Sequence, residues 1–148
     1  MQQGGNFGFL AARDSQLARL GALAESYFRS DPPAALLKLR LFGEALAKQI
    51  VARHGVTSSA SATFDELLRE GRARGIFPQQ VADLLFQIKR WGNAAAHEDR
   101  GSAADALNAL KFASAIGVWY HRTYRDAPSF DPGPFVPPVA PADADAAL

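Results

Sequence analysis

Residues 31–55, DPPAALLKLRLFGEALAKQIVARHG, contain the clearest helix of the sequence. Asp31 can accept a hydrogen bond as N-cap. The proline that follows it stands at the first helical position, where a backbone N–H would have no acceptor within the helix. The residues that then recur at helical spacing are Leu36, Leu39, Leu46 and Ile50. The pattern predicts a helix that ends near His54, because Gly55 can take the left-handed conformation of a C-cap.

Four further helices are expected around this one. We predict them at residues 14–28, 64–74, 103–124 and from about 78 through at least 91. Asp14 or Ser15 can cap the first, and Thr63 with Glu66 forms a capping box for the second. The helix at 103–124 is apolar on nearly every side, so we expect it to be the central and most buried one. The fold class is therefore all-α, a five-helix bundle.

The two ends of the chain differ from this helical part in composition. Residues 1–13 are rich in glycine, with Phe7, Phe9 and Leu10 as possible docking anchors. Residues 126–148 are rich in proline and alanine, which predicts an extended linker or tail without a packed element. We therefore divide the chain into a helical domain, 1–125, and a linker, 126–148, and expect it to continue in a longer protein.

The composition indicates which cell compartment and which partners to expect. There is no cysteine, which excludes disulfides, thiolate metal sites and Cys nucleophiles. Neither a signal peptide nor an apolar span of about 18 residues is visible, so we expect a cytoplasmic protein without a membrane partner. Residues 1–125 hold 16 Lys/Arg and 11 Asp/Glu, whereas residues 126–148 hold four Asp and no basic residue. A modestly basic body is compatible with nucleic-acid attraction but is also common in inert domains.

One polar face carries the candidate chemistry. At about 100° per residue, spacings of 3, 4, 3 and 4 place five side chains on one side of the helix that begins near 78. These residues are Asp83, Phe86, Arg90, Asn93 and His97. If the helix persists, Arg90 and His97 lie two turns apart; if Gly92 ends it, a turn at 93–97 could bring them closer. A guanidinium binds phosphate oxygens and an imidazole transfers protons near neutral pH, so the pair suits metal-independent RNA cleavage through the 2′-hydroxyl.

Structural roles compete with each of these functional ones. Arg90 can pair with Asp83 or Glu98, and His97 can cap a helix end. Phe86 can pack on the helix at 103–124, or it can be covered by a partner. We expect His54 at a helix C-terminus, and His121 and Tyr120 as core or rim residues. The basic group Arg69, Arg72 and Arg74 is either a solvated face or a nucleic-acid track.

The segment Lys89-Arg90-Trp91-Gly92-Asn93-Ala94-Ala95-Ala96-His97-Glu98 resembles the signature of the HEPN superfamily, an Arg separated from a His by four to six residues. Together with residues 6–10, 37–44, 119–124 and 130–138, it resembles the N-terminal helical region of type I restriction enzyme R-subunit-like proteins. In such proteins a helicase-type motor and a nuclease would follow.

The resemblance implies a nucleic-acid-associated bundle that dimerises and needs neither cofactor nor metal. Its working pair would be Arg90 and His97, with Asn93 as the polar residue between them. Two functions stay open: a metal-independent endoribonuclease acting on RNA, or a non-catalytic module that dimerises or helps a restriction motor hold DNA or partner subunits. A toxin–antitoxin-like partner is a weaker third reading.

Overall fold

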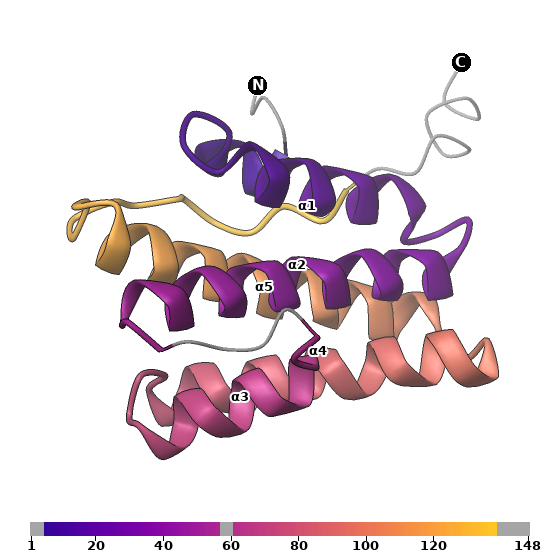
Figure 1. Cartoon of the computed structure of the whole chain (residues 1–148). Helices are drawn as coiled ribbons and strands as arrows, with labels where there is room; N and C mark the ends of the chain where they lie inside the picture. The colour runs from indigo at the N-terminus through magenta and orange to yellow at the C-terminus, as the bar shows by residue number, and fades with distance from the viewer. Residues whose placement is uncertain (1–4, 57–60, 139–148) are drawn as a thin grey trace.

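The computed structural model describes residues 5–56 and 61–138 of the chain. In these two ranges the regular elements are helices, one of them a short 3₁₀-helix, and no strand occurs. Their order is η1 (Gly5–Leu10), α1 (Ser15–Tyr27), α2 (Pro32–Arg53), α3 (Phe64–Ala73), α4 (Gln79–Glu98) and α5 (Ala103–Tyr124). Figure 1 shows the long helices side by side, with α1 on one side of α2 and with α3 and α4 on the other. The prediction of an all-α fold is confirmed for these two ranges.

Helix α2 is the central element. It contacts α1, α3, α4 and α5, and its residues Leu39, Phe42, Leu46 and Ile50 are fully buried. The expectation that the helix at 103–124 would be the most central one is wrong. Helix α5 packs on α2 and α4, but Lys111, Ala115, Arg122 and Thr123 leave one of its faces in solvent.

The capping residues fix where most helices begin. Asp31 accepts from the N–H of Ala34 at 3.3 Å, and Thr63 and Glu66 form the predicted capping box. A role of Asp14 as a side-chain cap of α1 is not found. Its carboxylate instead accepts two hydrogen bonds from Arg125, at 2.7 and 3.0 Å, which bind the start of α1 to the end of α5.

Helix α4 is continuous through Gly92 and ends only at Glu98, where Asp99 takes a left-handed conformation with φ 52°. The alternative of a turn at residues 93–97 is therefore wrong. Gly92 is needed for a different reason: a Cβ there would lie 2.5 Å from Cβ of Arg40, whose aliphatic stem crosses α4 at this point. The glycine is a close-approach site between α2 and α4 rather than a helix breaker.

Both ends of the described chain pack on the bundle. Phe7 and Leu10 of η1 are buried, as their role of anchors requires. Residues 126–138 have no helix or strand, yet Phe130 lies against Phe9 and His121, at 4.9 and 4.8 Å between ring centroids. The expectation of an unpacked segment is thus wrong up to residue 138. Residues 139–148 lie outside the described part, and the proposed domain boundary at 125/126 stays a prediction.

We name residues 126–138 the strap. Figure 1 shows it running back along the bundle between α1 and α5. The Asn6 side chain holds it in place, donating to the Val136 carbonyl at 2.7 Å and accepting from the Val136 N–H at 2.9 Å. None of the described helices has the length and apolarity that crossing a bilayer requires.

Candidate nucleic-acid interface

The three predicted site residues lie on the last three turns of α4. Arg90 and His97 are exposed and Asn93 is partly buried. Since α4 is an unbroken helix, the seven-residue separation places the Cα atoms of Arg90 and His97 about 10 Å apart along its axis. Arg90 lines a hollow between α3 and α4, and His97 is not among the residues that line it. The helix thus presents the guanidinium and the imidazole on one face without bringing them together.

Neither predicted carboxylate partner holds the Arg90 guanidinium. Arg90 Nη2 donates to Gln87 Oε1 at 3.0 Å on the same helix. Asp83 accepts from Gln79 Nε2 at 2.8 Å, and Glu98 accepts from Arg100 at 3.2 Å. An amide cannot neutralise a guanidinium, so Arg90 keeps a full positive charge directed toward solvent.

His97 stands in the last turn of α4, where a positive charge is favourable to the helix dipole. The helix end itself is closed by the backbone, through the Asp99 N–H that donates to the Ala94 carbonyl. Across residues 5–56 and 61–138, the His97 side chain has neither a hydrogen bond nor an ion pair. The imidazole is exposed, and its nitrogens have no partner within the described ranges.

The hollow beside Arg90 has a volume of about 400 Å³. Four cationic and two acidic side chains line it together with one aromatic ring: Asp65, Arg69, Arg72, Asp83, Phe86, Lys89 and Arg90. Charge therefore favours a negatively charged occupant. We call these seven residues the α3–α4 hollow.

Asp65 is the hub of the ion pairs in the α3–α4 hollow. It accepts from Lys89 Nζ at 2.7 Å and from Arg69 Nε at 2.6 Å. The hydrogen bond from Lys89, and then that from Arg69, lowers the pKa of this carboxyl below its usual value. Asp65 is shared by these two cations, and Asp83 accepts from Gln79. Arg72 and Arg90 are therefore left without a carboxylate partner among the described residues.

Phe86 forms the apolar part of the hollow. Lys89 Nζ lies 5.4 Å from the ring centroid of Phe86, and the Arg72 guanidinium carbon lies 6.0 Å from it. These distances are within the range of cation–π attraction, so the ring orients both cations. Phe86 also packs against the hydrophobic core. The sequence suggested that a partner covers the Phe86 ring. Lys89 and Arg72 of the same chain provide part of this cover.

Sequence reasoning did not include Lys89 and Arg72 in the site. Lys89 belongs to the quoted motif, and Arg72 was left open between a solvated face and a nucleic-acid track. Their convergence depends on the relative position of α3 and α4, which helical periodicity within one helix does not contain. The only available signal was the run of three arginines at 69–74, of which Arg74 pairs with Glu70 away from the hollow.

The other candidate residues have structural partners. His54 Nε2 lies 2.7 Å from the Tyr124 hydroxyl at the joined ends of α2 and α5. Tyr120 is fully buried, and its hydroxyl lies 3.0 Å from Asp14 Oδ1. Burial, and then the Asp14 charge, raises the pKa of Tyr120 to about 12, so the phenol keeps its proton. Within the described ranges, His, Asp and Glu side chains do not gather in threes as a metal site would need.

Comparisons with known proteins give a relative and a family match for the chain. The chain is 29% identical over 122 residues to the type I restriction enzyme EcoKI endonuclease subunit of Escherichia coli strain K12. The match covers 82% of this chain and 10% of that protein, so the chain spans about a tenth of its relative's length. No solved structure matches the chain.

A family profile, described as a domain of unknown function and designated DUF4145, matches residues 23–128. This range contains the helices α2 to α5 and so all seven residues of the α3–α4 hollow, together with Asn93 and His97. It excludes η1 and most of the strap. Since the match extends over well more than half of the sequence, the chain belongs to the DUF4145 family.

Proposed function

We propose that the chain is an accessory helical module of a restriction-type protein and that it binds the phosphate backbone of nucleic acid at the α3–α4 hollow. The observation that carries this proposal is the pair Arg72 and Arg90, two cations without a carboxylate partner in the described chain, at the rim of a cavity of about 400 Å³. The restriction context is inferred from the similarity to the EcoKI endonuclease subunit.

The chemistry of the hollow favours phosphate over other anions. Guanidinium groups offer planar forks of N–H donors that match phosphate oxygens, and backbone contacts of this kind give affinity without sequence preference. The exposure of Arg72 and Arg90 lets a long polyanion approach from solvent. No step of this function requires Arg90 and His97 to meet in one protomer.

Binding of a labelled RNA and of a labelled DNA duplex, followed by fluorescence anisotropy at several salt concentrations, tests this proposal. We expect the double variant Arg72→Ala/Arg90→Ala to bind both more weakly, with a slope of log Kobs against log salt that is less steep by about 1 for each cation removed. The matched control removes two exposed cations elsewhere, Arg19 and Lys48, and should leave the slope nearly unchanged. Equal effects of the two double variants would show that only net charge matters.

A second candidate function is a metal-independent endoribonuclease assembled by two protomers. It is favoured by one specific observation: Arg90, Asn93 and His97 share a solvent-facing side of α4, and His97 has no partner in the described chain. If two such faces came together, the guanidinium of one protomer could stabilise the phosphate while the imidazole of the other removed the 2′-hydroxyl proton. Homodimerisation is part of this proposal.

Complementation between two inactive variants tests the dimeric nuclease. Arg90→Ala and His97→Ala should each be inactive on RNA, whereas their equimolar mixture should regain about a quarter of the wild-type rate, because half of the randomly formed dimers are mixed and each of these holds one complete composite site out of two. Activity that stays absent in the mixture, with a wild-type chain that sediments as a monomer, would exclude this second function.

A further inference from the structure

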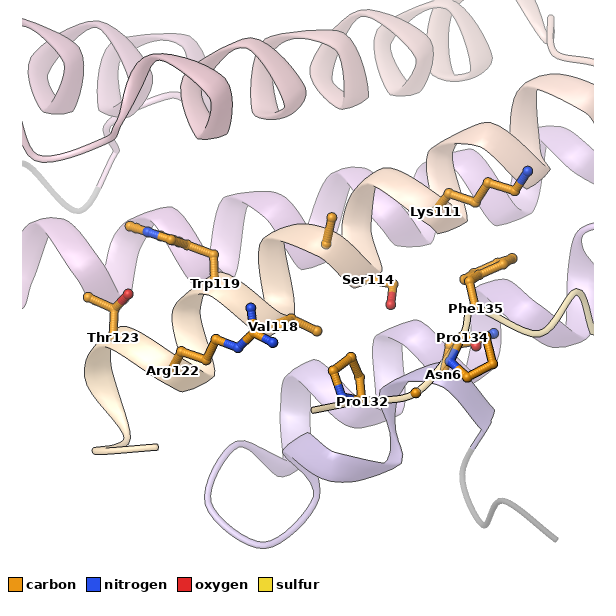
Figure 2. A pocket seen from close by; sticks show the side chains of 12 residues that line it. Asn6, Lys111, Ser114, Val118, Trp119, Arg122, Thr123, Pro132, Pro134 and Phe135 are labelled. Atoms are coloured by element: carbon orange, nitrogen blue, oxygen red, sulfur yellow. The ribbon is translucent and has the colours of Figure 1, made fainter. Parts of the chain in front are cut away.

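A second groove lies between α5 and the strap. Its volume is about 490 Å³, and it shares no residue with the α3–α4 hollow. Figure 2 shows α5 as one wall and strap residues Pro132 to Phe135 as the other. Two basic residues and no acidic residue line it. We call it the α5–strap groove.

The two cations of the groove lie on one face of α5. Lys111, Ala115, Val118 and Arg122 follow one another at spacings of 4, 3 and 4 residues, which places them in one stripe. Eleven residues separate Lys111 from Arg122, about 16 Å along the axis. Between them the wall carries Val118, which is mostly buried, and Ser114, whose hydroxyl faces the groove in Figure 2.

Each cation has an aromatic ring at the same end of the groove. In Figure 2, Trp119 lies beside Arg122 and Thr123 at one end, and Phe135 lies toward Lys111 at the other. Both rings are partly exposed. Tyr124 packs edge-to-face against the Trp119 indole, with 5.8 Å between ring centroids. The groove thus repeats one combination, a flat ring and a positive charge, at two points.

The Arg122 guanidinium is already oriented. Its Nε donates to the Phe130 carbonyl of the strap at 2.8 Å. The two terminal nitrogens have no partner among residues 5–56 and 61–138, so their N–H donors stay available. The strap is itself fixed by the paired hydrogen bonds between Asn6 and Val136. A ligand would therefore meet a groove whose two walls are formed before it binds.

From this arrangement we infer that the α5–strap groove binds a short stretch of single-stranded nucleic acid, two or three nucleotides long. Bases stack on Trp119 and Phe135, and phosphates contact Arg122 and Lys111. The hydroxyls of Ser114 and Thr123 supply further hydrogen bonds. An acidic peptide would satisfy the two cations but would leave the paired rings unused, and a duplex would keep its bases out of their reach.

Tryptophan emission tests the stacking directly. The chain has two tryptophans, so Trp91→Phe leaves Trp119 as the sole source of tryptophan emission. A single-stranded oligothymidylate should quench this emission on binding, whereas a duplex of equal length should leave it unchanged. Absence of quenching at saturation of the oligonucleotide would overturn the inference.

Removal of the Lys111 charge tests the phosphate contact. Lys111 has no partner in the described chain, so Lys111→Ala should make the salt slope for oligothymidylate less steep by about 0.7 without disturbing the fold. Arg19→Ala, which removes an exposed cation from α1, is the matched control and should have no effect on the slope.

The same titration separates this inference from the proposed function. If Lys111→Ala binds the oligonucleotide like the wild type while Arg72→Ala/Arg90→Ala does not, the α5–strap groove is not a site and the α3–α4 hollow remains one. If a polyglutamate peptide quenches Trp119 and displaces the oligonucleotide at equal charge, the ligand class is wrong. Weaker oligonucleotide binding by Lys111→Ala, with RNA and duplex binding of Arg72→Ala/Arg90→Ala unaffected, supports the groove and contradicts the proposed function.

Discussion

At the scale of single residues, two buried carboxylates respond to their surroundings in opposite ways. Burial raises the pKa of Asp14, but the hydrogen bonds from Arg125 and Tyr120 outweigh it, and the pKa lies below its usual value. Burial also raises the pKa of Glu25, and here the hydrogen bonds from Asn6 do not compensate, so its pKa stays above its usual value. The difference follows from the partner: Asp14 faces a cation and Glu25 faces an amide.

The Asp14–Arg125 pair is expected to be a major contributor to stability. Arg125→Ala leaves a carboxylate, only 2% exposed, without its cation, which should lower the free energy of unfolding by about 3 kcal/mol in urea denaturation at neutral pH. Because the folded pKa of Asp14 is depressed, this deficit should shrink as the pH falls through that pKa. A loss below about 0.5 kcal/mol, as expected for an exposed residue such as Arg19, would contradict this role.

Glu25 should give a pH dependence of the opposite sign. A group whose pKa is raised by folding binds its proton more tightly in the native state, so stability is lost as the pH rises from 4.5, the ordinary glutamate value, through the raised pKa. The wild type should therefore lose stability relative to Glu25→Gln over this window. Two parallel curves of unfolding free energy against pH would show that Glu25 titrates normally.

At the scale of helices, the close approach of α2 and α4 explains why a glycine interrupts the motif. Gly92→Ala would gain about 1 kcal/mol of helix propensity. The new Cβ would however lie 2.5 Å from Cβ of Arg40, an atom next to the α2 backbone that no rotamer can move away. We expect a net destabilisation of about 1–2 kcal/mol in urea melts, as is usual for overpacking.

Gly117 on α5 provides the matched control for Gly92. A Cβ there would meet its nearest neighbours, side-chain atoms of Leu10 and Phe42, at 3.5 Å, an ordinary contact. Gly117→Ala should therefore be neutral or stabilising. If both alanine variants gained stability, helix propensity alone would explain them and the close approach would have no energetic role.

Local sequence signals predict most of the helices, but they do not predict the α3–α4 hollow. Asp31, Gly55 and the Thr63–Glu66 capping box act through neighbours along the chain, which is why the ends of α2 and α3 follow from the sequence. The face shared by Arg90, Asn93 and His97 follows from periodicity in the same way. The α3–α4 hollow does not, because Asp65 and Lys89 are 24 residues apart and meet only through tertiary packing.

At the scale of the whole molecule, the strap joins the two ends of the described chain. Composition predicts that a proline-rich segment is extended, but it does not indicate what the segment contacts. The contacts come from Asn6, whose amide matches one N–H and one carbonyl of Val136, and from Phe130, whose ring packs against those of Phe9 and His121. Neither feature is visible in the sequence, because 130 residues separate Asn6 from Val136.

Removal of the Asn6 amide should release the strap and leave the bundle folded. In Asn6→Ala the Val136 N–H loses its acceptor, so its hydrogen exchange should become fast, while amides in the middle of α2 stay protected. Hydrogen exchange followed by NMR gives both readouts in one sample. Unchanged protection of Val136 would mean that other contacts hold the strap.

We propose that this chain binds nucleic acid through the α3–α4 hollow and that one protomer does not cut it. The most direct test incubates labelled RNA with the purified wild-type chain in EDTA, at concentrations where sedimentation shows a monomer, and follows binding and RNA length together. We predict RNA that is bound in a salt-dependent manner and recovered at full length. Fragments with 2′,3′-cyclic phosphate ends that disappear with His97→Ala would contradict the claim.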